Sequence, residues 1–398
     1  MKFRTICLIL ALMAVPSFAA AQDSDLIDEV DYDIDLPGAE LTEIMGDGGL
    51  QLDESDAEGG ALKRLVEKWP ADLVVAPIPG RSPQLGWTLA LGAGYFIQNK
   101  SAEPTDHPSI LGGFAMWAEN GSYAYGAGGN FHLMDDRLRI KAGAAYADVT
   151  YRYYGRGDGQ NQLPLNIDII QEMPLYFVQG LWNVWGRLYL GLGYLGGEVD
   201  TRIRVTLVDP ILPDSIALDV GALTVPFEWD SRDHEQFPRD GWYINGRATY
   251  YRKDGGSDFD ADIYKIALNN YLSMGESNVL ATRLMVRGTD DGVPFFLLST
   301  FGGSKDLRGY PSGRYRDRMM YALQTEYRWQ ATDKWIFTGF AGVGEVAADF
   351  SEFGDDFLPA AGVGVRYVLS EKHKVGLSFD VAEGKHGTEY YFGVGEAF

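Results

Sequence analysis

The sequence predicts an all-β fold, a transmembrane antiparallel β-barrel of the bacterial outer membrane. Three observations lead to this prediction. The chain opens with an export signal, no later apolar run is long enough for a membrane helix, and apolar residues then alternate with small or polar ones over most of its length. Aromatic residues make up 13% of the chain and 49 residues are glycine, and both enrichments suit strands with one lipid-facing side.

Residues 1–21 have the pattern of a cleaved secretory signal peptide. Basic residues precede the apolar stretch 6–15, and the alanines at 19–21 offer a cleavage site. The one cysteine, Cys7, lies in this segment. We therefore expect the exported chain to have no disulfide and no thiolate catalyst.

Residues 22–70 read as an acidic, mostly disordered periplasmic segment. Within it, residues 22–62 hold 14 Asp and Glu and no Lys or Arg, and apolar residues are too sparse to form a core. The barrel is expected to occupy residues 71–398. The net charge of −22 argues against nucleic acid as a partner.

Strands are indicated by alternation with a period of two. For example, Leu188, Leu190 and Leu192 are separated by Tyr189 and Gly191. A soluble β-sandwich also alternates. A membrane barrel is favoured because aromatic residues lie near the strand ends, as in a membrane-interface girdle. The opposite faces combine glycines with Arg, Glu and Gln, which suits a crowded or watery lumen.

The number of strand-like stretches is about sixteen, an even number as expected for a bacterial barrel. They begin near residues 85, 108, 121, 137, 165, 186, 217, 241, 261, 278, 293, 318, 334, 358, 374 and 388. The stretches at 108 and 293 have the weakest alternation, so fourteen strands is the alternative.

The last predicted strand carries a row of apolar residues on one face: Tyr390, Phe392, Val394 and Phe398. A terminal aromatic residue on such a strand resembles the signal read by the bacterial machinery that assembles barrels. Glu396 interrupts the row. We expect it at the membrane boundary, where a charge costs only about 0–1 kcal/mol.

Residues 301–328 carry the most specific motif. Leu307, Arg308, Gly309 and Tyr310 form an apolar–Arg–Gly–aromatic sequence. This sequence resembles the motif of the BamA/TamA family of outer-membrane barrels (the bacterial surface antigen family), and the resemblance extends over about residues 75–398. It implies a long loop between the eleventh and twelfth strands that folds back into the lumen. It also implies that Glu326, on the twelfth strand, faces the loop arginine.

The sequence departs from the family pattern in two ways. Family members usually carry an Asp on the thirteenth strand, two residues after an inward-facing aromatic, but here Phe340 is followed by Gly342. The repeated periplasmic POTRA domains of BamA and TamA are also missing, because residues 22–80 are too few to hold even one. The chain therefore resembles a short form of the family, with a loop contact that is weaker or differently arranged.

An enzyme is not expected. The sequence has no Gly-x-Ser-x-Gly motif, and its five histidines show no HExxH or other close metal-ligand spacing. We predict no catalytic residues, no cofactor and no metal site.

The resemblance implies a barrel that assists the insertion or passage of proteins, or of lipids, at the outer membrane of a Gram-negative bacterium. The expected partners are the lipid bilayer and client outer-membrane proteins. A periplasmic protein or a lipoprotein could also bind the acidic segment. The alternative is a passive channel or a structural surface-antigen barrel without insertase activity.

Overall fold

The computed structural model describes residues 73–82, 84–97, 109–155, 167–205, 215–234, 237–275, 277–303, 305–354, 356–370, 375–394 and 396–398. The predicted signal peptide and the predicted acidic segment lie outside these ranges, so their boundaries stay predictions. Within the described ranges, no helix is long and apolar enough to cross a membrane.

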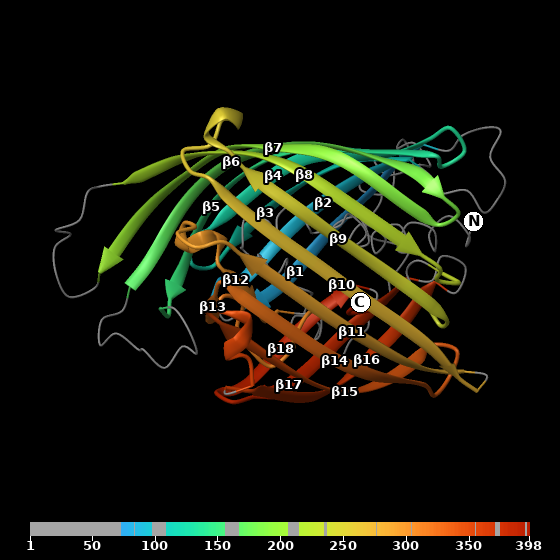
Figure 1. The fold of residues 1–398 in the computed structure, drawn as a ribbon. Helices are drawn as coiled ribbons and strands as arrows, with labels where there is room; N and C mark the ends of the chain where they lie inside the picture. The colour runs from blue at the N-terminus through green and yellow to red at the C-terminus, as the bar shows by residue number, and fades with distance from the viewer. Residues whose placement is uncertain are drawn as a thin grey trace, which may run out of the picture.

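Sixteen strands form one antiparallel sheet, each paired with its neighbour in the order of the chain (Figure 1). They are β1 (Leu73–Ser82), β2 (Gly86–Ile97), β3 (Ser109–Ala118), β4 (Tyr123–Leu133), β5 (Leu138–Tyr153), β6 (Ile167–Trp185), β7 (Leu188–Val205), β8 (Ile216–Asp230), β9 (Gly241–Tyr251), β10 (Ala261–Met274), β11 (Asn278–Thr289), β14 (Met319–Gln330), β15 (Trp335–Ala347), β16 (Leu358–Ser370), β17 (Val375–Gly384) and β18 (Gly387–Val394). The all-β fold and the antiparallel sheet of sixteen strands are confirmed.

Two short strands lie apart from this sheet. β12 (Ser299–Phe301) and β13 (Tyr315–Asp317) pair with each other inside the connection between β11 and β14. The 3-10 helices are η2 (Lys253–Gly255), η3 (Phe295–Leu297) and η4 (Phe350–Glu352). η3 belongs to the same connection as β12 and β13.

The predicted strand at residue 293 is wrong. The apolar run there forms η3 and β12 instead, and Phe296 and Leu297 are buried. A short apolar run without alternation does not reveal whether it faces lipid or protein. In this chain it packs inside the barrel.

The prediction also missed β1, which contains Pro77 and Pro79. Prolines argue against a strand in the middle of a sheet but are tolerated on an edge, where the missing N–H faces away from the ladder. β1 pairs with β2 along its whole length. The two missing donors are therefore expected on its other edge.

The outer wall of the sheet is apolar. On β2, Leu89 and Leu91 are exposed, whereas the alternating residues Thr88 and Ala90 are buried. Exposed tryptophans occur near the strand ends, for example Trp242 at the start of β9. This arrangement agrees with strands that turn a lipid-facing side outward.

The lumen is crowded rather than watery at the end where the β11–β14 connection enters. A buried apolar cluster joins inward-facing residues of β3 to β10, such as Met116, Val199 and Ile263, to Phe296 and Leu297 of the connection. Of the two predicted alternatives, a crowded or a watery lumen, the structure shows the crowded one at this end.

The first and last strands lie side by side. Cα atoms of β1 and β18 approach within 8 Å. Among the described residues, β1 has a hydrogen-bonded ladder with β2 and β18 has one with β17, and no ladder joins β1 to β18. We call this junction the seam.

Candidate functional site in the barrel lumen

The lumen loop, residues 290–318, connects β11 to β14 and folds back into the barrel, as the resemblance implied. Its tip is fully enclosed, because Leu307, Arg308 and Tyr310 each have 0% exposure. Gly309 has φ of +113°, and a Cβ there would lie 3.0 Å from the Cβ of Ala360. Only glycine meets both the left-handed backbone and the close approach to the wall.

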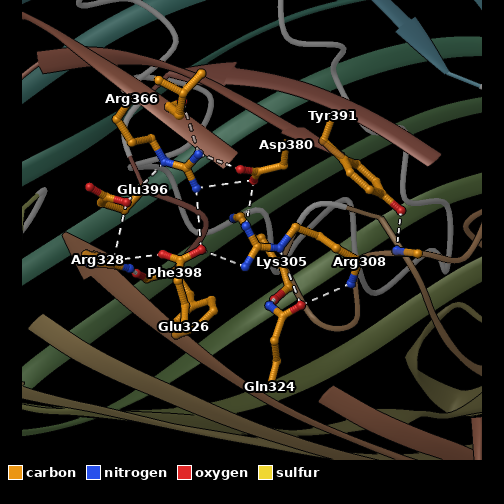
Figure 2. A network of polar contacts seen from close by, with 12 residues as sticks. Lys305, Arg308, Gln324, Glu326, Arg328, Arg366, Asp380, Tyr391, Glu396 and Phe398 are labelled. Atoms are coloured by element: carbon orange, nitrogen blue, oxygen red, sulfur yellow. Dashed lines mark hydrogen bonds and ion pairs between the residues drawn. The ribbon is translucent and has the colours of Figure 1, made fainter. Parts of the chain in front are cut away.

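Arg308 is held by carboxylates from two different strands (Figure 2). Its Nη2 donates to Oε2 of Glu326 on β14 at 2.7 Å, and its Nη1 donates to Oδ2 of Asp380 on β17 at 2.6 Å. The guanidinium also lies over the ring of Phe340, 3.4 Å from its centroid. A planar fork of donors can satisfy two carboxylates and stack on an aromatic ring at the same time.

Asp380 takes the place of the carboxylate that was expected at position 342. A Cβ at Gly342 would lie 2.7 Å from Cδ1 of Leu307 and 2.6 Å from the carbonyl oxygen of Leu323. The loop leucine thus occupies the space in which a thirteenth-strand Asp would stand. The contact is differently arranged, with its second carboxylate on β17.

Sequence reasoning did not find Asp380. The signal was present, because Asp380 interrupts the small residues on the inward face of β17, between Ser378 and Ala382. A carboxylate on a lumen face needs a cationic partner. The partner could not be identified, because it lies 72 residues earlier in the chain.

Two further arginines complete the ion pairs around Glu326. Nε of Arg328 lies 2.8 Å from Oε1 of Glu326, and Nη2 of Arg366 lies 3.4 Å from Oε2. Arg366 also donates through Nη1 to Oδ1 of Asp380 at 2.5 Å. Both arginines are buried.

Glu396 is the third carboxylate of the cluster. Its Oε2 lies 3.2 Å from Nε of Arg366 and 3.3 Å from Nε of Arg328. We call these six groups the arginine network: Arg308, Arg328, Arg366, Glu326, Asp380 and Glu396. It contains three positive and three negative groups, so it is neutral although it is almost completely enclosed.

The position of Phe398 corrects the prediction for the last strand. Tyr390 is 53% exposed on the outer face of β18, but the strand ends at Val394, and Phe398 does not continue that face. Instead its ring packs against buried Tyr271 and Val279 of β10 and β11. The main-chain oxygen of Phe398 accepts a hydrogen bond from Nη2 of Arg328 at 2.9 Å.

Glu396 was likewise misplaced. It was expected at the membrane boundary, but its side chain is buried between Arg328 and Arg366. Two buried cations attract the carboxylate inward, and this outweighs continuation of the apolar row. Phe392 lies on β18, as predicted, and the side chain of Val394 falls outside the described residues.

The lumen loop is also attached to the last three strands. The hydroxyl of Tyr310 donates to the carbonyl oxygen of Pro359 on β16 at 2.6 Å. The amide of Gly309 donates to the hydroxyl of Tyr391 on β18 at 2.8 Å. Tyr310 and Phe301 pack edge-to-face within the loop. On the other side of the seam, the side-chain amide of Gln84 donates to the carbonyl oxygen of Ser312.

A second polar cluster lies around the turn between β4 and β5. We call it the turn network, and its members are His132, Asp136, Arg139, Lys141, Tyr189 and Glu228. Asp136 receives hydrogen bonds from Nη2 of Arg139 at 2.6 Å and from the hydroxyl of Tyr189 at 2.9 Å. Glu228 pairs with Lys141 at 2.9 Å and with Arg139 at 3.2 Å.

Burial alone would raise the pKa of Asp136. The hydrogen bonds from His132, Arg139 and Tyr189 and the charge of Arg139 outweigh this effect, so the pKa of the carboxyl lies well below its usual range. Across the described part of the chain, no group of three or more His, Cys, Asp or Glu residues is placed to hold a metal ion.

Comparison with known proteins identifies the region that holds the lumen loop and the arginine network. Residues 219–398 match the Omp85 superfamily domain. The chain carries an Omp85 domain. All six residues of the arginine network and the whole lumen loop lie within it, which confirms the resemblance to the BamA/TamA family.

Solved structures of Omp85 proteins share the fold beyond the matched domain. BamA from Haemophilus ducreyi lacking POTRA domains 1–3 is similar with a TM-score of 0.57 and 16% identity, over 81% of this chain and 69% of that one. CdiB from Acinetobacter baumannii has a TM-score of 0.51 and 12% identity, and CdiB from Escherichia coli has 0.54 and 11%.

Each CdiB match covers 81% of this chain, but only 59% and 62% of the respective CdiB chains. This chain thus spans less than two thirds of those relatives. No curated protein sequence matches the chain. The Omp85 domain implies a location in the outer membrane, and the likeness to BamA and CdiB, at 11–16% identity, shows a shared fold.

Proposed function

We propose that this protein assists the insertion or passage of proteins, or of lipids, at the outer membrane of a Gram-negative bacterium, which it reaches after cleavage of residues 1–21. The observation that carries the proposal is the lumen loop held by Arg308. The buried guanidinium of Arg308 binds carboxylates of β14 and β17 and so holds these strands and the lumen loop together. The seam between β1 and β18 is then the part of the wall where strand pairing can change.

The seam is suited to admit another strand. Its two edges are adjacent, and none of the described residues joins them in a ladder. The prolines of β1 remove two hydrogen-bond donors, which weakens any ladder that this edge can form. An edge with unpaired carbonyl groups is still a template for a strand from another chain.

Unfolded outer-membrane proteins are the proposed clients, and the bilayer is the medium into which they pass. The acidic segment 22–70 is proposed to recruit a periplasmic protein or a lipoprotein with a basic face, through charge attraction. We infer that the role is not enzymatic, because strand exchange at a seam requires no covalent chemistry.

An insertion assay in liposomes tests this function. The purified protein is reconstituted, an unfolded barrel client is added from outside, and its insertion rate is read from the band shift on a semi-native gel. Empty liposomes and an unrelated barrel serve as references. We expect insertion faster than in both, and slower insertion with Arg308→Ala.

Arg318→Ala is the matched control, because this arginine lies at the end of the lumen loop and pairs with exposed Asp291. It should leave the rate unchanged. A rate equal to that of the unrelated barrel would contradict the proposal for the protein acting alone. A large, stable conductance in planar bilayers would then favour the passive channel, because a lumen filled by the loop predicts small, flickering currents.

A further inference from the structure

Three polar side chains lie next to one another on the lipid-facing side of the wall. In the strand pairing, Asn270 of β10 is opposite Thr282 of β11, and Thr282 is opposite Thr325 of β14. Their chain neighbours Asn269 and Glu326 are buried in the lumen, so by alternation the three side chains point outward. We call them the polar row. It crosses the wall formed by β10, β11 and β14, which are neighbouring strands (Figure 1).

The polar row lies near the middle of the band that faces lipid. Thr325 is four residues from Tyr321 and four from Trp329, and aromatic residues of this kind mark the membrane interfaces. With a rise of about 3.3 Å per residue and a tilt of about 40°, each aromatic residue is about 10 Å away in depth. The rows on either side carry large, mainly apolar side chains: Leu268, Leu284 and Leu323 in one, and Leu272, Leu280 and Tyr327 in the other.

The hydrogen-bonding capacity of the polar row is only partly used. The hydroxyls of Thr282 and Thr325 share one hydrogen bond of 3.3 Å, which leaves one of the two hydroxyl hydrogens over. Nδ2 of Asn270 donates to the carbonyl oxygen of Gly241 at 3.5 Å, a long contact, and its Oδ1 accepts no hydrogen bond from any residue that the structure describes. Lipid tails offer neither donors nor acceptors, so unused groups at this depth raise the free energy of an isolated barrel.

The lipid-facing stretch of β6 and β7 is apolar by comparison. Its exposed side chains include Val178, Leu190 and Leu192. In membrane proteins, amide and hydroxyl side chains that meet the bilayer hydrogen-bond to a neighbouring segment of protein. The polar row therefore marks a part of the wall to which another protein in the bilayer can bind.

We propose that the polar row is the centre of an interface between two copies of this protein in the membrane. Two barrels inserted in the same direction form a closed pair about a two-fold axis along the membrane normal, and such an axis keeps every residue at its depth. An axis through Thr282 places Thr282 opposite the partner's Thr282, and Asn270 opposite the partner's Thr325. Amide and hydroxyl groups each donate and accept, so every facing pair can form a hydrogen bond.

A second copy fits this surface better than an unrelated membrane protein. Symmetry supplies it with polar groups at the same depth and in the reverse order, whereas another protein would need a matching row of its own. The interface also leaves the seam free, because β15, β16, β17 and β18 separate β14 from it. The inference therefore does not depend on the proposed insertase function.

Energy transfer between labelled copies in liposomes tests the interface. Cys7 is the only cysteine, so Cys7→Ser with Ser277→Cys places one dye on the exposed turn between β10 and β11. Arg187→Cys in the same background places it on the exposed turn between β6 and β7. Donor-labelled and acceptor-labelled pools of the full chain are mixed during reconstitution. Transfer at 277 should be at least about twice that at 187, because the width of two barrels separates the latter dyes.

The contribution of the polar row is measured by diluting the labelled protein with lipid. Asn270→Leu combined with Thr325→Val should raise the dissociation constant of the dimer about tenfold, because both changes remove hydrogen bonds across the interface. Thr325→Ser is the matched control. It keeps the hydroxyl and should leave the dissociation constant close to that of the parent.

Three results would overturn the inference. The first is transfer no higher than that of an unrelated barrel mixed at random, at every ratio of protein to lipid. The second is equal transfer at 277 and 187, which would exclude an interface on β10, β11 and β14. The third is an unchanged dissociation constant in the double variant. Heat-modifiability on gels confirms that each variant compared is a folded barrel.

Discussion

The two polar networks of the lumen are built in different ways. The arginine network joins the lumen loop to β14, β16, β17 and Glu396, with side-chain exposures of 0–6%. The turn network centres on one hairpin turn, between β4 and β5, and reaches across to β7 and β8, with exposures of 7–28% among its ion pairs. The first is enclosed, whereas the second is in contact with solvent.

This difference determines when each network can form and what it contributes. Asp136 and Arg139 are three residues apart, so a single hairpin brings them together. Arg308 and Asp380 are 72 residues apart and meet only when the last strands are in place. The turn network therefore stabilises a local element, whereas the arginine network can form only after the last strands have joined the barrel.

The largest effect is expected from Arg366→Ala. This change removes the cation shared by Glu326, Asp380 and Glu396 and leaves an excess buried negative charge. We expect a loss of about 3–5 kcal/mol in the free energy of unfolding. Urea titration of the refolded barrel measures it. Arg204→Ala, at an exposed position of β7, is the control. An equal loss in both variants would contradict the claim that the buried ion pairs of Arg366 stabilise the barrel.

Asp380→Asn tests the carboxylate from β17. The amide keeps the shape but loses the charge that Arg308 and Arg366 share. We expect a loss of about 1.5–3 kcal/mol, because hydrogen bonds to charged groups are worth that much. The same titration applies. Stability equal to the parent would mean that Glu326 alone suffices to hold Arg308.

The turn network should respond to pH. Because the pKa of Asp136 is lowered in the folded protein, the carboxylate stabilises the barrel above its unfolded pKa of about 3.9, and this stabilisation is lost as the pH falls further. Asp136→Asn should lose about 1–2 kcal/mol at neutral pH and become less sensitive to acid. Urea midpoints at several pH values, compared with Asp135→Asn, measure this. Parallel curves for parent and variant would contradict the assignment.

Lys141→Met should have the smallest effect. Glu228 keeps Arg139 as a partner when Lys141 is lost, and the site is partly solvated. We expect a change of about 1 kcal/mol or less. A loss as large as that of Arg366→Ala would show that the turn network is as strongly desolvated as the arginine network.

Alternation was sufficient to predict most of the barrel, because lipid on one side and a confined lumen on the other impose a period of two. Prediction from alternation failed where the position of a segment in the barrel, rather than its local pattern, determined its structure. Pro77 and Pro79 hid β1 because prolines argue against a strand unless its edge position is known. Phe296 and Leu297 were assigned to a strand because local pattern does not show whether an apolar run faces lipid or protein.

The candidate site was predictable only where a motif carried it. Arg308 and Glu326 could be paired by resemblance, and the structure brings them together. Asp380 could not be paired, since the topology that makes it a neighbour of Arg308 is not visible in local sequence. Phe398 was placed on the outer wall because its strand pattern was extended through Glu396, whose attraction to two distant arginines carries no local signal.

The position of the second carboxylate, on β17 rather than on β15, has an evolutionary consequence. Leu307 fills the space above Gly342, and Asp380 on β17 holds the guanidinium of Arg308. A lineage can thus relocate the carboxylate without losing the arginine at any step, provided that both acids coexist briefly. We expect the three positions to vary together among relatives, with an acid at 342 accompanied by a smaller residue at 307 and a neutral one at 380.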